Sequence, residues 1–290
     1  MKKIFLCLIS LILVLSSLLS FTACDSEEPP AAEKPTGTET TAAPTEEETT
    51  EEETTEEETT AAEEITGAYT DEDGKYPILN KLTVAAIGDS YIAGTGGKWP
   101  DILAQKYGMR YYNYGISGST VSSYVSDRNP MVKRYQEMAA VDANIVIIEG
   151  GRNDFNAYTP IGNVDSRNPI TFSGALNIII DASKEKYPDA MIVLITPWNF
   201  PDKDTHPMTY LHYVNAMLAV AEYQGERVYC INASDTSLTG VDMRSSSFRR
   251  TYCLKESDVS HLNSRGMQMV APRFEKILAE YYADFLIHKK

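Results

Sequence analysis

Short apolar runs alternate with helix-period segments from about residue 76 to the end of the chain. Residues 145–148, Ile-Val-Ile-Ile, form the kind of continuous apolar run that is buried on both faces of a sheet. Between Ala175 and Ala182, apolar residues recur at positions i, i+3, i+4 and i+7, which predicts an amphipathic helix. The predicted strands cover residues 82–87, 110–114, 145–148, 191–195 and 228–231, and the main helices cover residues 100–107, 175–182, 209–223 and 267–285.

Five strands that alternate with helices predict an α/β fold with a mostly parallel central sheet, covered by helices on both faces. The last helix contains Pro272, which either kinks the helix or marks its true start. We expect one folded domain over residues 76–290.

The chain opens with a targeting segment over residues 1–24. Lys2 and Lys3 precede an apolar stretch, and small residues lead to Cys24. This pattern resembles the signal peptide of an exported lipoprotein, which implies that Cys24 is lipidated and anchors the protein to a cell membrane, facing outside. The alternative is an ordinary secretory signal cut near Ala23. A transmembrane anchor is less favoured, because an acidic, Thr-rich sequence follows and no strong stop-transfer pattern does.

Residues 25–75 are expected to form a disordered linker. Between Asp25 and Thr66 there are sixteen acidic residues and one lysine, and this composition buries too little apolar surface to offset the conformational entropy of folding. The segment accounts for most of the formal net charge of −15, since residues 67–290 hold 23 basic and 25 acidic residues. A nearly neutral domain excludes a strongly basic nucleic-acid surface, and we expect no nucleic-acid partner.

Polar residues are concentrated in loops that follow the predicted strands and in one segment before the last helix. These segments are Gly-Asp-Ser at 88–90, Gly-Ile-Ser-Gly-Ser at 115–119, Gly-Gly-Arg-Asn-Asp at 150–154 and Asp-Val-Ser-His at 258–261. In a parallel sheet, ligands bind outside the carboxyl ends of the strands. We therefore expect these segments to meet at one edge of the sheet.

The four segments resemble, in order, the signature blocks of the SGNH or GDSL hydrolase family. The resemblance covers about residues 82 to 285 and implies a three-layer α/β/α sandwich with a flavodoxin-like topology. It also implies that Ser90 is the nucleophile, that His261 is the general base oriented by Asp258, and that Ser90, Gly118 and Asn153 form the oxyanion hole. No metal or other cofactor is implied.

The chemistry of these residue types agrees with that assignment. A serine hydroxyl needs a neighbouring base, and histidine titrates near neutral pH. Of the four histidines, only His261 has an acid three positions earlier, which can orient the imidazole and stabilise its charged form. Each residue alone has a structural explanation: Ser90 as a helix cap, Asn153 in a turn, Asp258 as a loop cap. Their joint occurrence in this order favours catalysis.

Further residues are expected to line the substrate or to form a disulfide. Asp89, Tyr91, Arg152 and Trp198 follow strand ends next to the predicted site, and Trp198, Phe200 and Tyr91 are candidates for stacking on sugar rings, although Trp198 and Phe200 are equally explained as packing residues. Cys230 and Cys253 are the only thiols in the exported domain, and the sequence leaves open whether they pair or stay free.

The family includes carbohydrate acetylesterases, lipases, lysophospholipases and acyltransferases, and its signature blocks do not distinguish among these activities. A position outside the cell favours removal of acetyl or other short acyl groups, with an acylated carbohydrate or another small ester as the substrate. We expect the protein to be a monomer. A lipase or lysophospholipase, or an O-acyltransferase of the same family, is the alternative. An alternative of another class is a glycan-binding surface module without activity, which would be expected to have a broken triad.

Overall fold

The computed structural model describes residues 70–95, 98–202 and 206–289. The predicted signal peptide, the lipidation site Cys24 and the linker as far as residue 69 lie outside the described residues. Within the described ranges, no helix combines the length and the hydrophobicity that crossing a bilayer requires.

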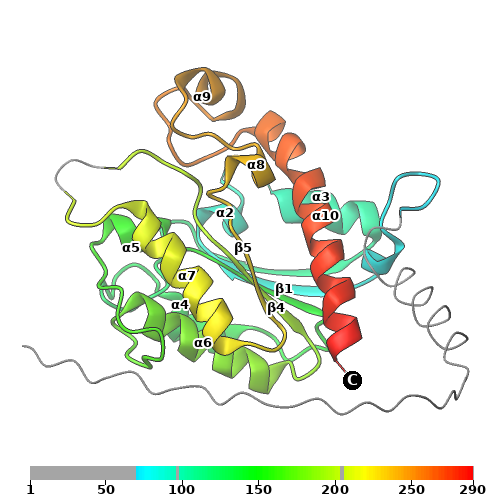
Figure 1. The fold of residues 1–290 in the computed structure, drawn as a ribbon, viewed down its shortest axis with the longest axis horizontal. Helices are drawn as coiled ribbons and strands as arrows, with labels where there is room; N and C mark the ends of the chain where they lie inside the picture. The colour runs from blue at the N-terminus through cyan, green and yellow to red at the C-terminus, as the bar shows by residue number, and fades with distance from the viewer. Residues whose placement is uncertain (1–69, 96–97, 203–205, 290) are drawn as a thin grey trace, which may run out of the picture. The chain divides into compact units, whose positions relative to one another are not determined.

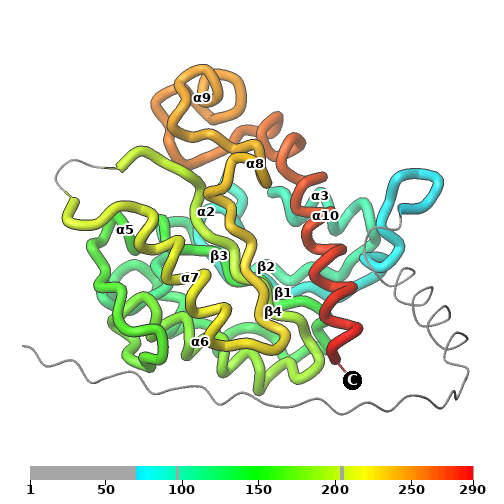
Figure 2. Tube along the Cα trace, in the orientation of Figure 1, coloured from blue at the N-terminus to red at the C-terminus, as the bar shows by residue number. Residues whose placement is uncertain are grey.

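The centre of the domain is a five-stranded sheet in the order β2-β1-β3-β4-β5, and every neighbouring pair is parallel. Figure 2 shows these neighbouring strands along the Cα trace. All residues of the central strands β1, β3 and β4 are buried, as their continuous apolar runs predict. The strands are β1 (Thr83–Gly88), β2 (Arg110–Gly115), β3 (Ile145–Glu149), β4 (Met191–Ile195) and β5 (Val228–Ile231).

Helices cover both faces of the sheet, which confirms the predicted three-layer arrangement. On one face α3 (Trp99–Tyr107) packs beside α10 (Ser264–His288), and on the other α6 (Phe172–Lys186) packs beside α7 (Tyr210–Gln224) (Figure 1). The shorter elements are η1 (Pro77–Leu79), α2 (Ser90–Ala93), α4 (Met131–Arg134), η2 (Tyr135–Glu137), α5 (Arg152–Asn156), α8 (Thr236–Thr239) and α9 (Ser246–Tyr252).

Aromatic side chains join the helices within each layer. Trp99 of α3 meets Phe274 of α10 edge-on, with ring centroids 4.5 Å apart, and Phe172 of α6 meets Tyr213 of α7 at 5.1 Å. These rings are fully buried. Edge-to-face packing of this kind stabilises by about 1 kcal/mol beyond the burial of the ring area.

The last helix is longer than its sequence pattern predicts. It begins at Ser264, where the side chain of Asn263 accepts a hydrogen bond from the backbone amide of Gly266, and it continues through Pro272. The interpretation of Pro272 as the helix start is therefore wrong. A proline removes only one backbone hydrogen-bond donor from a helix. Buried residues of α10 pack against the core both before Pro272, as Met267 does, and after it, as Phe274 does.

Candidate active site

The four motif segments meet at the carboxyl edge of the sheet. Ser90 begins α2, separated from the end of β1 by one residue, and Gly118 lies in the loop after β2. Asn153 lies in α5 after β3, and His261 precedes α10. Gly88 pairs with Gly115 on one side and with Glu149 on the other, so the ends of the three strands are level. This register places the segments that follow them side by side.

Ser90 is the first residue of α2 and is 8% exposed. The turn between β1 and α2 is sharp, and the Asp89 side chain caps it by accepting a hydrogen bond from the amide of Tyr91 at 3.1 Å. A β-carbon at Gly115 would lie 2.2 Å from the backbone nitrogen of Ala93. Glycine at this position therefore lets the end of β2 lie against the helix that carries Ser90.

Ser90, His261 and Asp258 form a continuous chain of hydrogen bonds. The His261 Nε2 lies 3.0 Å from the Ser90 Oγ, and the His261 Nδ1 lies 3.1 Å from the Asp258 Oδ2. With the proton on Nδ1, the imidazole donates to the carboxylate and accepts from the serine hydroxyl. This is the arrangement in which histidine can take the serine proton.

Hydrogen bonds to backbone groups fix the loop that carries His261. Asp258 Oδ1 accepts hydrogen bonds from the amides of Ser260 and His261, and Leu262 bridges to Cys253 in antiparallel fashion. Partial burial acts to raise the pKa of Asp258, but those amide bonds and the contact with His261 outweigh it and hold the pKa below its ordinary value of 3.8. Asp258 is therefore ionised at neutral pH.

The predicted oxyanion-hole residues lie next to one another. Asn153 Nδ2 donates to the backbone carbonyl of Ser119 at 3.0 Å and to Asp89 Oδ2 at 3.1 Å. Gly118 immediately precedes Ser119 and adopts a φ of +80° with open space where a β-carbon would lie. The loop thus needs glycine for its backbone conformation, and the open space leaves room for a substrate.

Two buried carboxyl groups support this arrangement. Burial raises the pKa of Asp89 to about 7, partly opposed by the hydrogen bond from Tyr91, and raises the pKa of Asp154 to about 6. Asp154 accepts hydrogen bonds from the amides of Val121 and Ser122, and so joins α5 to the loop after β2. Asp154 is not among the predicted site residues, although its place beside Asn153 in the Gly-Gly-Arg-Asn-Asp segment was a signal.

The structure contradicts three of the four predicted substrate-lining residues. Asp89, Tyr91 and Trp198 are at most 1% exposed, and Tyr91 and Trp198 pack edge-on at 5.4 Å. Phe200 is also buried, so packing and not sugar stacking explains these rings. Position after a strand end does not tell which face of the chain a side chain occupies.

Arg152 alone of that set is partly exposed beside the candidate triad. Its Nε donates a hydrogen bond to Ser260 Oγ at 3.1 Å, and its NH1 donates one to Asn156 Oδ1. The guanidinium carbon lies 4.0 Å from the ring centroid of Phe200. Burial lowers its pKa, and the nearby acidic groups Tyr91, Asp89 and Asp258 oppose this.

Both cysteines of the domain are free, so the alternative of a disulfide is not realised. Cys230 lies in β5, whereas Cys253 follows α9 and its Sγ lies 3.4 Å from the sulfur of Met243. Burial raises the pKa of the Cys230 thiol to about 12 and that of Cys253 to about 11. Neither thiol is therefore a nucleophile at neutral pH.

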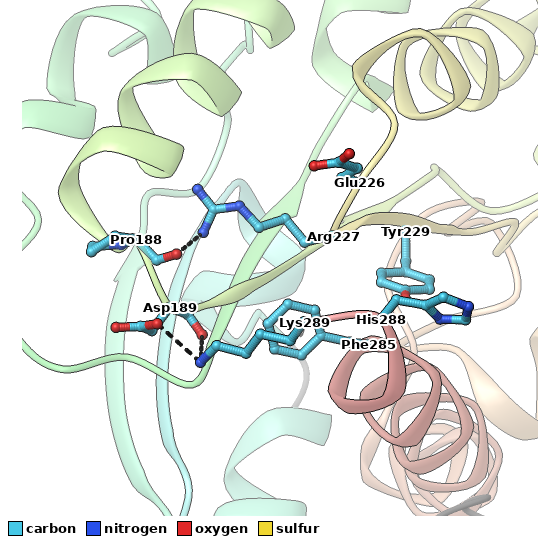
Figure 3. Close-up of a pocket in the computed structure, with 8 residues that line it drawn as sticks. All are labelled: Pro188, Asp189, Glu226, Arg227, Tyr229, Phe285, His288 and Lys289. Atoms are coloured by element: carbon cyan, nitrogen blue, oxygen red, sulfur yellow. Dashed lines mark hydrogen bonds and ion pairs between the residues drawn. The ribbon is translucent and has the colours of Figure 1, made fainter. Parts of the chain in front are cut away.

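A surface cavity of about 490 Å³ lies at the amino edge of the sheet, opposite the candidate site, and is lined by residues at the starts of β4 and β5 (Figure 3). None of its lining residues belongs to the four motif segments. Its lining comprises Pro188, Asp189, Glu226, Arg227, Tyr229, Phe285, His288 and Lys289. Among the described residues, no three His, Cys, Asp or Glu side chains are grouped as metal ligands.

Comparison with known proteins found a matching family model and solved structures of the same fold. A model of the GDSL-like lipase/acylhydrolase family matches residues 86–269. No curated protein matches the chain in sequence. A solved structure from Lactobacillus plantarum is 22% identical with a TM-score of 0.59, covering 69% of this chain and 97% of its own. A possible lipase from Chitinophaga pinensis is 18% identical with a TM-score of 0.52, covering 68% and 98%. These two structures share the fold.

Proposed function

The chain belongs to the GDSL-like lipase/acylhydrolase family and is an ester-hydrolysing enzyme, and on this premise we propose that it is a monomeric, cell-surface serine esterase that removes short acyl groups, acetyl above all, from carbohydrate. The observation that carries the proposal is the unbroken chain of hydrogen bonds from Ser90 through His261 to Asp258.

In the first half of the proposed reaction, the Ser90 Oγ attacks the ester carbonyl while its proton passes to His261 Nε2. The carbonyl oxygen becomes an oxyanion. As the tetrahedral intermediate collapses, the bond from carbon to the sugar oxygen breaks, and His261 gives its proton to that oxygen. In the second half, water attacks the acyl-serine by the same route, and acetate and free Ser90 are released.

In the proposed reaction the oxyanion is stabilised by the side-chain amide of Asn153 and by two backbone amides. The Asn153 amide is held by Asp89 and by the carbonyl of Ser119, and the backbone amides of Ser90 and Gly118 add two further donors. One Asn153 hydrogen must turn from its present partner toward the oxyanion. Burial raises the pKa of Asp89 to about 7. When this carboxyl is protonated, its hydrogen bond with the Asn153 amide is weaker than that of the carboxylate.

Two observations support a small, polar substrate at the cell surface. The helix α9 precedes the loop of His261 and has the sequence Ser-Ser-Phe-Arg-Arg-Thr-Tyr. Its two aromatic residues, Phe248 and Tyr252, pack against the core and its other residues are polar, so this helix is not an apolar lid. The lipoprotein-like signal over residues 1–24 and the acidic linker are the basis for proposing surface anchorage. A lipase of long-chain esters is the second candidate.

The test is acetate release from a panel of acetylated polysaccharides, measured beside hydrolysis of long-chain esters and of phospholipid. We expect acetate release by the wild type and none above background by Ser90→Ala, with unchanged circular dichroism. A preference for long-chain esters would contradict the carbohydrate assignment. Activity that survives Ser90→Ala, or that is lost to a chelator, would contradict the serine mechanism itself.

A further inference from the structure

A buried arginine connects the two segments that must act together in catalysis. Arg134 is the last residue of the short helix α4, is 7% exposed, and lies in no motif segment. Its guanidinium donates hydrogen bonds to four oxygens: the backbone carbonyls of Gly88, Tyr114 and Asn129, and the hydroxyl of Ser119.

These acceptors lie on both sides of the candidate oxyanion hole. Gly88 is the last residue of β1, two positions before Ser90, and its carbonyl is 2.7 Å from Arg134 NH2. Ser119 follows Gly118, and its hydroxyl is 3.1 Å from the same NH2. A single nitrogen therefore joins the segment that carries the nucleophile to the loop that carries the oxyanion-hole glycine.

The loop itself folds back onto Arg134. The amides of Met131 and Val132 donate to the carbonyls of Thr120 and Val121, so the start of α4 lies along the loop. Asn129 adopts a φ of +46°, and its carbonyl accepts from both Arg134 Nε and Ser119 Oγ. Asparagine tolerates this left-handed conformation better than other residues except glycine, and here the conformation accompanies a carbonyl that accepts hydrogen bonds from both Arg134 and Ser119.

We infer that Arg134 is a positioning residue for the oxyanion hole: its guanidinium fixes the loop of Gly118 against the turn of Ser90. The inference rests on the proposed serine mechanism. Arg134 touches no reacting atom, so its effect is on the geometry in which the transition state is bound. Burial lowers its pKa to about 10, so it remains charged at neutral pH.

Lysine cannot replace this arrangement, because an ammonium has three donors on one atom and cannot span acceptors that lie on separate segments. For Arg134→Lys we expect kcat for 4-nitrophenyl acetate to fall by about 10- to 100-fold, since a misplacement near 1 Å costs about that much, while KM stays within about twofold. Ser119→Ala removes one of the four bonds and should lower kcat by a few-fold.

Arg227 supplies a matched control at the opposite edge of the sheet. Its guanidinium also bonds backbone carbonyls, those of Lys184, Tyr187, Pro188 and Ala190, but none of them belongs to the site. Arg227→Lys should lower the melting temperature and leave kcat within about twofold of the wild type. Equal loss of kcat in the two lysine variants would overturn the inference, because the effect would then be general destabilisation.

Hydrogen–deuterium exchange separates this inference from the proposed function. In Arg134→Lys, and in Ser119→Ala if the former does not fold, the amides of residues 116–130 should exchange faster than in the wild type, whether or not any ester is hydrolysed. A wild type that hydrolyses no ester contradicts the proposed function. Unchanged exchange over residues 116–130, or a kcat within twofold of the wild type for folded Arg134→Lys, overturns the role of Arg134.

Discussion

Asp89 should make the folded domain less stable as the pH rises, and Asp89→Asn should remove this effect. The carboxyl is fully buried, and burial raises its pKa from 3.8 to about 7. Below pH 3.8 it is protonated in both the folded and the unfolded chain. Between pH 3.8 and 7 the unfolded chain ionises while the folded chain keeps the proton, so the free energy of unfolding falls with pH.

The size of the effect follows from the same two values. The interval from 3.8 to about 7, at about 1.4 kcal/mol for each pH unit, corresponds to about 4 kcal/mol of unfolding free energy. The stability of Asp89→Asn relative to the wild type should therefore rise by about 4 kcal/mol between pH 4 and pH 8. Asparagine keeps an oxygen for the amide of Tyr91 but places an NH2 group, which cannot accept a hydrogen bond, against the Asn153 amide, so kcat should fall by about tenfold.

The assay is urea unfolding followed by circular dichroism at several pH values from 4 to 8. Asp235→Asn is the control with the opposite sign: hydrogen bonds from the side chain and the amide of Ser237 hold the pKa of Asp235 below 3.8, so its stabilisation is lost only as the pH falls further. Its difference from the wild type should stay level across this range. A difference between Asp89→Asn and the wild type that changes by less than about 1 kcal/mol would refute the reasoning.

Three further changes address the reaction and the anchor. Asn153→Ala should lower kcat for 4-nitrophenyl acetate by about 100- to 1,000-fold with little change in KM; a change in KM alone would make Asn153 a binding residue. Asp258→Asn should lower kcat/KM at neutral and higher pH, because the imidazole loses its orienting partner; an unaltered kcat/KM would exclude Asp258 from the triad. Cys24→Ala should move the protein out of the membrane fraction of its host or leave the signal uncleaved, and a normal pool of processed membrane protein would argue against lipidation.

The strands were predicted to within one residue at each end, because continuous apolar runs such as 191–195 are bounded by turn residues. The start of α6 at Phe172 was missed, since the helix period becomes evident only from Ala175. The start of α10 was also missed: the cap at Asn263 lies upstream of the apolar stripe, and Pro272 suggested a later boundary.

Some residues of the candidate site could be predicted from the sequence and others could not. Short sequence motifs contain the four polar residues of the site, which are Ser90, Asn153, Asp258 and His261. Their proximity could be predicted from the order of these motifs in a parallel sheet. The burial of Trp198 could not, because it depends on packing against Tyr91 and Phe274, which are distant in the sequence. Arg134 has no motif at all, and its importance is visible only from the carbonyls that surround it.

The hydrogen bond between Ser90 and His261 joins residues 171 positions apart, which has a consequence for how activity arises during synthesis. Closing so long a loop carries an entropic cost that a contact must repay, so we expect it to follow the formation of local structure. A chain that has emerged only as far as β5 has its nucleophile and both oxyanion segments but no base. Hydrolysis therefore requires that His261 has reached Ser90, and we expect the time course of activity to report the formation of that contact.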